Sequence, residues 1–406
     1  MKNLGSHEAF SLSGNALLPQ EEMLETGKKT QKLVIGIPAD TDKNESRMPL
    51  TPFAVEQLVN HGHEVFLESK AADKINFTDN DYSETGAFIS TSKKEVMQCD
   101  IILKVSPLSE EEIEMLRGNQ LLITSLHYTI QKEAYFRKLI DKRVTALAFE
   151  YIKDENDCFP IVRSMSEIAG STSILIAAEY LSNVHNGKGE MLGGITGVNS
   201  TEVVILGAGT AGEFAARTAL GLGALVKVFD TSAHKLRRLQ NNIGQRIYTS
   251  IMQARVLAKA LRSADVVIGA VRFQDDHPRC YATEEMVQNM KKNSVIIDIG
   301  IDQGGCFETS RITSHSNPTY MKHGVLHYCV PNIPSRVART ASYAISNIFA
   351  PFLIKFAEAG NIRNIIKEDA GIRNGVYLYN GILTKSAIGE LFNIPYKDIH
   401  LLIAAF

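Results

Sequence analysis

Short apolar runs alternate with charged, helix-like stretches along most of the chain. In the first part, apolar runs predict strands at 32–38, 100–105, 119–127 and 145–150. Between them, the charged stretches 108–117 and 131–141 predict helices. Thr51 is expected to cap a further helix, with Pro52 at its first position. This alternation predicts a mostly parallel sheet covered by helices on both faces.

A second series of the same kind begins near residue 203. Its apolar runs end in glycine or aspartate, and they read VVILG, LVKVFD, ADVVIGA and NSVIIDIG. Helical patterns at 233–242 and 252–263 separate these runs. Two long helical stretches, 165–187 and 338–360, flank the series. We therefore expect the chain to leave the first sheet by one long helix and to return to it by the other.

The predicted fold class is α/β, with two doubly wound, Rossmann-like domains and a cleft between them. A polar N-terminal arm is expected at 1–32 and has no apolar signal core. The substrate domain is expected to be discontinuous, built from 33–160 and 339–406. The second domain, expected at 161–338, contains the run GAGTAG after an apolar strand, a pattern typical of dinucleotide binding, and is the predicted NAD-binding domain.

The stretch VVILGAGTAGEFAARTALGLGALVKVFD contains a dinucleotide-binding pattern. Gly207 permits a tight turn, Gly209 lets the backbone approach a pyrophosphate, and Gly212 lets the helix pack on the strand. Asp230 ends the next predicted strand, where it can accept the adenosine ribose hydroxyls and repel a 2′-phosphate. The alternative is a glycine-rich turn without a ligand, but the complete strand, turn, helix, strand and acid favour NAD.

Composition excludes several classes of function. The formal net charge of −2 gives no indication of nucleic-acid or anionic-membrane binding. No apolar stretch approaches the roughly 20 residues that span a bilayer. The five cysteines form no CxxC pair, which indicates a reducing compartment. No metal is expected, because HExxH is absent and His61 and His63 favour a solvated turn before a strand over a metal site.

Four polar residues stand at predicted strand ends or in the adjoining loops, where open α/β sheets bind ligands. Arg47 is suited to hold a carboxylate, although a surface ion pair is equally consistent with its pattern. His127 is suited to proton transfer, but a lone histidine at a strand end is more often structural. Asp302 fits either an active-site carboxylate or a turn cap. Asn332 is a loop amide beyond a later strand.

Five sequence blocks together resemble the alanine dehydrogenase and pyridine-nucleotide transhydrogenase family. They are GIPADTDKNESRMPLTP, MSEIAG, ILGAGTAG, DIGIDQGGCFETSRITSHSNPTY and YCVPNIPS. The likeness begins near residue 33 and runs over nearly all of the remaining chain. MSEIAG and DQGGCFE indicate the alanine dehydrogenase branch.

This resemblance implies the NAD-dependent oxidative deamination of a small L-amino acid, with L-alanine giving pyruvate and ammonium. It implies that Arg47 binds the substrate carboxylate, that His127 is the catalytic acid and base, and that Asp302 is its partner. It also implies a homo-oligomer, commonly a hexamer, in the cytoplasm. The residues expected to bind the cofactor are Met165, Ser166, Gly207, Gly209, Thr210, Ala211, Gly212, Asp230, Val271, Ile299, Asn332 and Ile333.

One position departs from the family pattern. A second lysine that contacts the substrate carboxylate is expected after DIILKV, and this chain has Ser106 there. Lys104 points to the same face of the strand, and Arg163 is another candidate replacement cation. Both Lys104 and Ser106 are kept as candidate substrate-binding residues. The departure leaves two other functions open, a transhydrogenase-type NAD(H)-binding subunit and a non-catalytic NAD-binding homologue.

Overall fold

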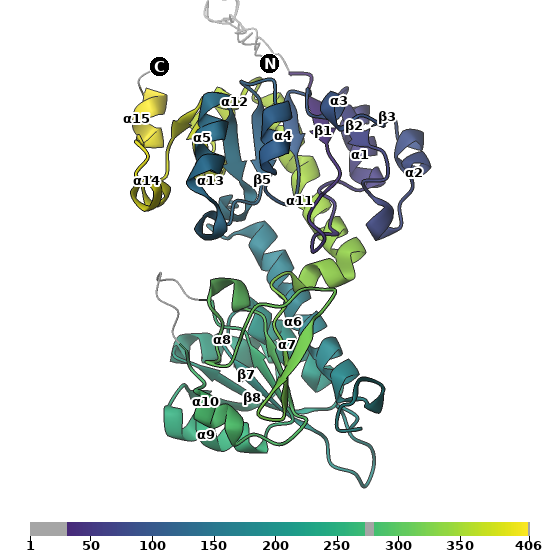
Figure 1. Ribbon diagram of the computed structural model, residues 1–406, viewed down its shortest axis with the longest axis vertical. Helices are drawn as coiled ribbons and strands as arrows, with labels where there is room; N and C mark the ends of the chain where they lie inside the picture. Colours follow the sequence, from purple (N-terminus) through teal and green to yellow (C-terminus); the bar gives the residue numbers. More distant parts are fainter. Residues whose placement is uncertain (1–30, 273–279, 405–406) are drawn as a thin grey trace, which may run out of the picture.

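The computed structural model describes residues 31–272 and 280–404, and its strands form two sheets in separate lobes (Figure 1). Most of the expected N-terminal arm, residues 1–30, lies outside the described residues. The predicted two-domain α/β fold is confirmed. The domain limits at 160/161 and 338/339 remain a prediction.

The first sheet has eight strands in the order β15-β14-β6-β5-β4-β1-β2-β3. Strands β1 to β6 are parallel, whereas β14 and β15 pair antiparallel at one edge. The central strands β4, β5 and β6 are fully buried, because helices cover the sheet on both faces. The strand bounds are β1 (Val34–Ile37), β2 (Glu64–Glu68), β3 (Phe88–Ser90), β4 (Ile101–Leu103), β5 (Leu121–Thr124), β6 (Thr145–Ala148), β14 (Val376–Tyr379) and β15 (Ile382–Leu383).

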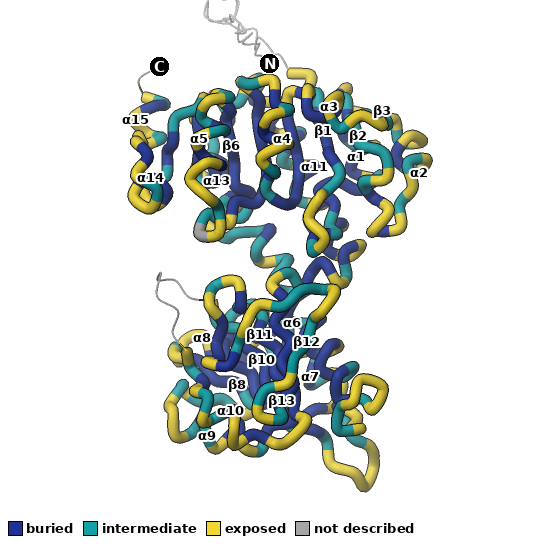
Figure 2. Tube along the Cα trace, in the orientation of Figure 1, coloured by how far each residue is buried: buried dark blue, intermediate teal, exposed yellow. Residues whose placement is uncertain are grey.

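Helices from both ends of the described chain cover this sheet, and apolar side chains gather between helices and strands. The strands of the sheet are accordingly coloured mostly as buried in Figure 2. The helices of this lobe are α1 (Pro52–Asn60), α2 (Asp79–Glu84), α3 (Lys93–Val96), α4 (Glu110–Met115), α5 (Glu133–Asp141), α12 (Ile362–Glu368), α13 (Ala370–Gly375), α14 (Ser386–Phe392) and α15 (Ile399–Ala404).

The second sheet has seven strands in the order β12-β13-β11-β10-β7-β8-β9. All of its pairs are parallel except β12 with β13. The strands are β7 (Glu202–Leu206), β8 (Leu225–Asp230), β9 (Tyr248–Ile251), β10 (Val266–Gly269), β11 (Val295–Asp298), β12 (Thr319–Lys322) and β13 (Val325–Tyr328). The helices are α7 (Thr210–Gly221), α8 (Ala233–Ile243), α9 (Ala254–Ser263) and α10 (Glu284–Gln288).

Two long helices, α6 (Pro160–Leu181) and α11 (Ala338–Glu358), join the lobes and pack against each other (Figure 1). The segment after α11 returns to the first sheet, where β14 pairs with β6. Gly170 of α6 lies against α7, since a Cβ at Gly170 would come within 2.2 Å of the Ala211 carbonyl oxygen. The connecting helix therefore passes directly beside the start of α7.

Two local expectations were wrong. Thr51 occupies the position before α1, but its hydroxyl makes no cap and instead lies 3.0 Å from the Ser346 hydroxyl. This hydrogen bond links α1 to α11, and it engages the hydroxyl that would otherwise cap α1. His61 is exposed as expected, but His63 is buried, because it turns beneath the start of β1 and its Nδ1 lies 3.5 Å from the amide of Leu33.

Within residues 31–272 and 280–404, no helix combines the length and the apolar composition that a membrane crossing needs.

Candidate active site

The loops of the first lobe that carry candidate residues follow adjacent parallel strands. Arg47 follows β1, Ser106 follows β4, and His127 follows β5. Strand β1 lies between β2 and β4. The chain continues from β1 to β2 and β3 on one side, and then crosses to β4, β5 and β6 on the other side, so the strand order reverses between β1 and β4. Open α/β sheets bind ligands at such a switch point, beyond the carboxyl ends of the strands. The topology thus brings these loops to one edge of the first sheet.

The second lobe repeats this arrangement, with the switch between β7 and β10. Gly207 follows β7, and Val271 follows β10. Asp302 lies in the short 3₁₀ helix η6 (Ile301–Gln303) after β11, and Asn332 directly precedes η7 (Ile333–Val337) after β13. All four residues therefore belong to loops at the carboxyl edge of the second sheet.

The glycine-rich turn has the backbone geometry that a dinucleotide requires. Gly207 has φ +108°, and a Cβ there would come within 2.5 Å of the Ala270 oxygen. A Cβ at Gly212 would come within 1.9 Å of the Gly207 oxygen, so only glycine allows α7 this close to the loop. A Cβ at Gly209 would meet nothing within 4 Å, which leaves open space beside the N-terminus of α7. The turn therefore fits a pyrophosphate held on helix N–H groups.

Asp230 at the end of β8 supports the same turn. One carboxylate oxygen accepts a hydrogen bond from the Ala208 amide at 2.7 Å, and the other accepts from the Ser232 amide at 2.8 Å. The side chain is 6% exposed. A carboxylate held this way keeps lone pairs for ribose hydroxyls, so the residues present fit NAD.

The remaining predicted cofactor residues lie on several segments of the chain. Thr210 and Ala211 form the first turn of α7. Val271 lies between the glycine turn and the loop after β11, because a Cβ at Gly207 or Gly300 would come within about 3 Å of its backbone. The others are partly or fully buried residues of adjoining segments: Met165 and Ser166 of α6, Ile299 after β11, and Ile333 of η7. Their contacts with a cofactor stay predictions.

His127 has an unusual backbone conformation. Its φ of 44° and ψ of 52° lie in the left-handed region, which costs free energy for any residue with a Cβ. The Glu150 carboxylate holds this conformation by accepting hydrogen bonds from the amides of Leu126 and His127, at 2.7 and 3.2 Å. The histidine side chain is exposed. Backbone strain of this kind clusters at sites where a side chain is presented to a ligand.

Asp302 lies opposite His127, on the other lobe. The Asp302 side chain is exposed to solvent, yet partial desolvation by the surrounding protein raises its pKa, while the charges of His127 and Arg272 act to lower it. The two candidate acid–base groups are therefore within electrostatic reach of each other although they belong to different sheets. A carboxyl group with a raised pKa beside a histidine is typical of sites that move protons.

Arg47 is held by a residue that our sequence reasoning missed. Its Nε and Nη2 donate to the two carboxylate oxygens of Glu45, at 2.8 and 2.6 Å. Ser335 and Asn332, from the segment before α11, also donate to Glu45, at 2.8 and 3.0 Å. Glu45 was detectable in principle, since it lies two residues before Arg47, but its remote partners are 287 and 290 positions away.

The position that departs from the family pattern has a local partner. The Ser106 hydroxyl binds Asp40. Lys104 is 2% exposed, and its Nζ lies 2.8 Å from Glu112 and 3.7 Å from Asp40. Arg163 is exposed and pairs with Glu167 on α6. This geometry favours an internal ion-pair role for Lys104, and its substrate role stays a prediction.

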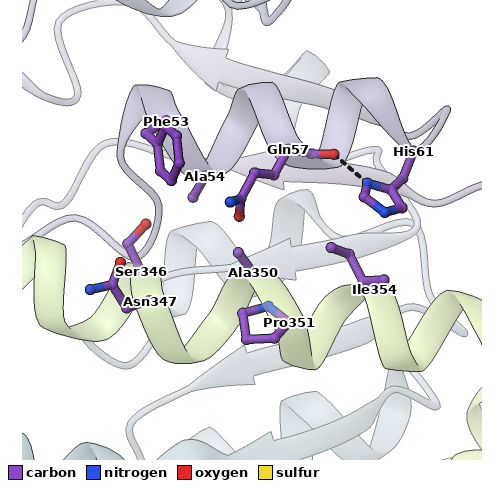
Figure 3. Close-up of a pocket in the computed structure, with 9 residues that line it drawn as sticks. All are labelled: Phe53, Ala54, Gln57, His61, Ser346, Asn347, Ala350, Pro351 and Ile354. Carbon is purple, nitrogen blue, oxygen red and sulfur yellow. Dashed lines mark hydrogen bonds between the residues drawn. The ribbon is translucent and has the colours of Figure 1, made fainter.

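A separate surface hollow of about 390 Å³ lies between α1 and α11 (Figure 3). No candidate residue for substrate or cofactor belongs to its lining, so it is not part of the site at the strand ends. The lining residues are Phe53, Ala54, Gln57, His61, Ser346, Asn347, Ala350, Pro351 and Ile354.

Two family models together match most of the chain. The model described as alanine dehydrogenase/PNT, N-terminal domain, matches residues 36–169, and that described as alanine dehydrogenase/PNT, C-terminal domain, matches residues 173–386.

The chain belongs to the alanine dehydrogenase/PNT family.

Relatives within this family match over nearly their whole length. The chain is 38% identical to an alanine dehydrogenase of Methanococcus maripaludis, over 90% of this chain and 98% of that protein. It is 36% identical to the alanine dehydrogenase of Geobacillus stearothermophilus, over 91% of this chain and 99% of that protein. The family resemblance inferred from the sequence blocks is thus confirmed.

Solved structures agree with this assignment. An L-alanine dehydrogenase superposes with a TM-score of 0.84 at 34% identity, covering 89% of this chain and 99% of that one. A transhydrogenase from Sinorhizobium meliloti superposes with a TM-score of 0.74 at 23% identity, over 86% of this chain and 100% of that one. The second likeness shows a shared fold only.

Proposed function

We propose that this protein catalyses the NAD-dependent oxidative deamination of L-alanine to pyruvate and ammonium, in a reversible reaction. The observation that carries the proposal is the full-length match to alanine dehydrogenases at 36–38% identity. The glycine turn and Asp230 fit NAD, and the loops that face each other carry a cation, a histidine and a carboxylate.

Arg47 is proposed to bind the substrate carboxylate. Glu45 occupies the Nε and Nη2 edge of its guanidinium, which leaves the edge formed by Nη1 and Nη2 for a second carboxylate. A carboxylate bound there fixes the substrate Cα relative to the opposite lobe. NAD, held at the glycine turn and Asp230, would supply the acceptor for the hydride on that Cα.

His127 and Asp302 are proposed to manage the protons of the second half-reaction. Once the Cα–N bond has become a C=N bond, water adds at that carbon, and loss of ammonia leaves the 2-oxo acid. One proton must leave the attacking water and one must reach the departing nitrogen, so a group that both accepts and donates is required. His127 supplies it, and Asp302 steadies its charged form.

A substrate screen tests this function. Purified protein with NAD is incubated with each of the twenty amino acids, and with NADH plus ammonium and common 2-oxo acids, while absorbance reports NADH. L-Alanine and pyruvate are expected to give the fastest turnover. Tight NADH binding without turnover of any compound would instead identify a non-catalytic homologue.

We also propose that the chain assembles as a homohexamer in the cytoplasm. An exposed apolar loop supports an oligomer, since Met191, Ile195 and Val198 are 59%, 65% and 61% exposed. The five free cysteines support a reducing compartment. Light scattering on the wild type and on Ile195→Glu tests the assembly, with a smaller particle expected for the variant.

A further inference from the structure

Glu45 joins parts of the chain that are far apart in sequence. The residue is 3% exposed and lies within the loop that follows β1 of the first lobe. One of its oxygens lies 2.8 Å from Arg47 Nε and 2.8 Å from the Ser335 hydroxyl. The other lies 2.6 Å from Arg47 Nη2 and 3.0 Å from Asn332 Nδ2. A single carboxylate therefore contacts both the proposed substrate arginine and the loop that follows β13.

This carboxylate stays ionised at every working pH. Burial alone raises the pKa of Glu45, but the charge and hydrogen bonds of Arg47, with a smaller contribution from Ser335, hold the pKa at about 2. Breaking a buried ion pair on one side is costly, because the remaining charge is left without a partner. Arg47 consequently cannot rotate away from Glu45 at low cost, and its direction follows that of Glu45.

The second lobe sets the position of Glu45. Asn332 Nδ2 also lies 3.2 Å from the backbone carbonyl oxygen of Asn44 and 2.9 Å from the Ser335 hydroxyl. Both protons of this amide nitrogen are therefore used in hydrogen bonds within the protein. The amide oxygen is then the atom left to bind a ligand. A ligand that moves the Asn332 side chain must shift Glu45 as well.

A second contact fastens the same two segments. The Asn44 side chain accepts a hydrogen bond from the His315 amide at 3.3 Å, and His315 Nε2 lies 2.8 Å from the Asn332 carbonyl oxygen. Hydrogen bonds of Glu45 and of Asn44 therefore both join the loop after β1 to the segments before β12 and after β13.

We propose that Glu45 is a positioning residue that couples the nicotinamide side of the cofactor site, at Asn332, to the direction of Arg47. NADH and a substrate carboxylate then bind cooperatively, because each ligand favours the same arrangement of this one carboxylate. The inference rests on the proposed function, since it takes Arg47 and Asn332 as ligand-binding residues.

The coupling is measured without turnover, by using pyruvate in the absence of ammonium. The dissociation constant of NADH is determined by fluorescence titration with and without saturating pyruvate, and the ratio is the coupling factor. We expect roughly 5- to 150-fold for the wild type, the usual range of coupling between two sites. In Glu45→Gln this factor should fall to near 1, and the affinity for NADH alone is read from the same titration without pyruvate.

Two further variants separate coupling from folding. Ser335→Ala removes one link to Glu45 but leaves the Arg47 pair, so it should lower the coupling factor while pyruvate still binds. Glu64→Gln, whose exposed pair with Lys32 lies elsewhere, is the matched control and should behave as the wild type. Should Glu45→Gln fail to fold, Ser335→Ala alone decides the question.

The outcomes distinguish this inference from the function on which it rests. An unchanged coupling factor in folded Glu45→Gln, or in Ser335→Ala, overturns the inference and leaves the function standing. A uniform loss of both separate affinities with coupling preserved also overturns it, because that result describes a purely structural ion pair. A wild type that binds NADH but no pyruvate overturns the function and the inference together.

Discussion

The Ser106 hydroxyl lies 2.7 and 2.6 Å from the two carboxylate oxygens of Asp40. Its single proton is thus committed to a neighbouring acid, and Asp40 also acts electrostatically on Arg47. A lysine at position 106, as in the family pattern, would neutralise Asp40 and add positive charge beside Arg47. In this chain a substrate carboxylate bound at Arg47, as we propose, would instead meet one arginine with an acid close by.

Ser106→Lys should therefore raise kcat/KM for L-alanine, mainly by lowering KM. One added charge-assisted hydrogen bond is worth about 1.5–3 kcal/mol, or roughly ten- to hundredfold. Initial rates over a range of alanine concentrations measure the effect.

Lys104→Met is the companion variant. It should lower Tm with little change in KM, because Lys104 neutralises buried Glu112. A large rise in KM would show that Lys104 binds substrate.

Asp40→Asn should improve carboxylate binding by a different route. The substitution keeps an oxygen for Ser106 but removes a negative charge close to Arg47, so KM should fall by roughly three- to tenfold at low salt. Asp42→Asn removes the same charge from an exposed position in the same loop and should have little effect. Equal effects of the two substitutions, or none, would contradict a local role for Asp40.

Asp230 should set the choice of cofactor. Repulsion of a 2′-phosphate predicts that the wild type prefers NAD over NADP by roughly a hundredfold or more in kcat/KM. Asp230→Asn should narrow this preference, since the repulsion is lost and Arg238, 3.2 Å from the Ala208 oxygen, lies beside the same turn. Steady-state rates with both cofactors provide the test. Efficient use of NADP by the wild type would refute the assignment.

His127→Asn should lower turnover by roughly 10²–10⁴-fold, the usual loss when a proton-transfer group is removed. Asparagine is chosen because it tolerates the left-handed backbone of this position better than most residues. NADH binding should be almost unchanged, because His127 belongs to the other lobe. Near-normal turnover in the variant would assign His127 a structural role only.

The stability of the second lobe should depend on pH through His327. Burial lowers the pKa of this fully buried histidine to about 4, from an ordinary value of 6.5. The neutral His327 side chain therefore makes its full contribution to the free energy of unfolding, about 3 kcal/mol, above pH 6.5. This contribution is lost as the pH falls through about 4. Thermal unfolding of the wild type and His327→Phe between pH 7 and 4 checks this. Their difference in Tm should shrink at low pH, and a constant difference would count against it.

The arrangement of strands could be predicted because parallel, doubly buried strands leave continuous apolar runs in the sequence. The run 145–150 corresponds to β6, and the run 100–105 contains β4. The role of Thr51 could not be predicted in this way. A capping residue and a residue that binds a distant helix have the same local sequence, and the partner Ser346 lies 295 positions away.

The residues of the candidate site show the same difference between features that a local motif encodes and features that depend on distant partners. Residues that follow strands, such as His127 and Asp302, could be predicted as candidates because loops at strand ends bind ligands, and their roles stay predictions. Glu45 and Asp40 were missed, because their importance comes from partners rather than from a motif. A carboxylate two residues before an arginine is common in loops. Only the folded chain brings Asn332 and Ser335 to Glu45, or Ser106 to Asp40.

The return of the chain to the first sheet fixes the order in which the two lobes are completed during translation. The last strand of the second sheet, β13, ends at residue 328, whereas β14, which pairs with β6, ends at residue 379. A nascent chain thus carries β6 as an open edge while the second lobe already has all its strands. Open edges invite mispairing with other chains. The lobe begun first is finished last, and β6 needs protection until residue 379 has left the ribosome.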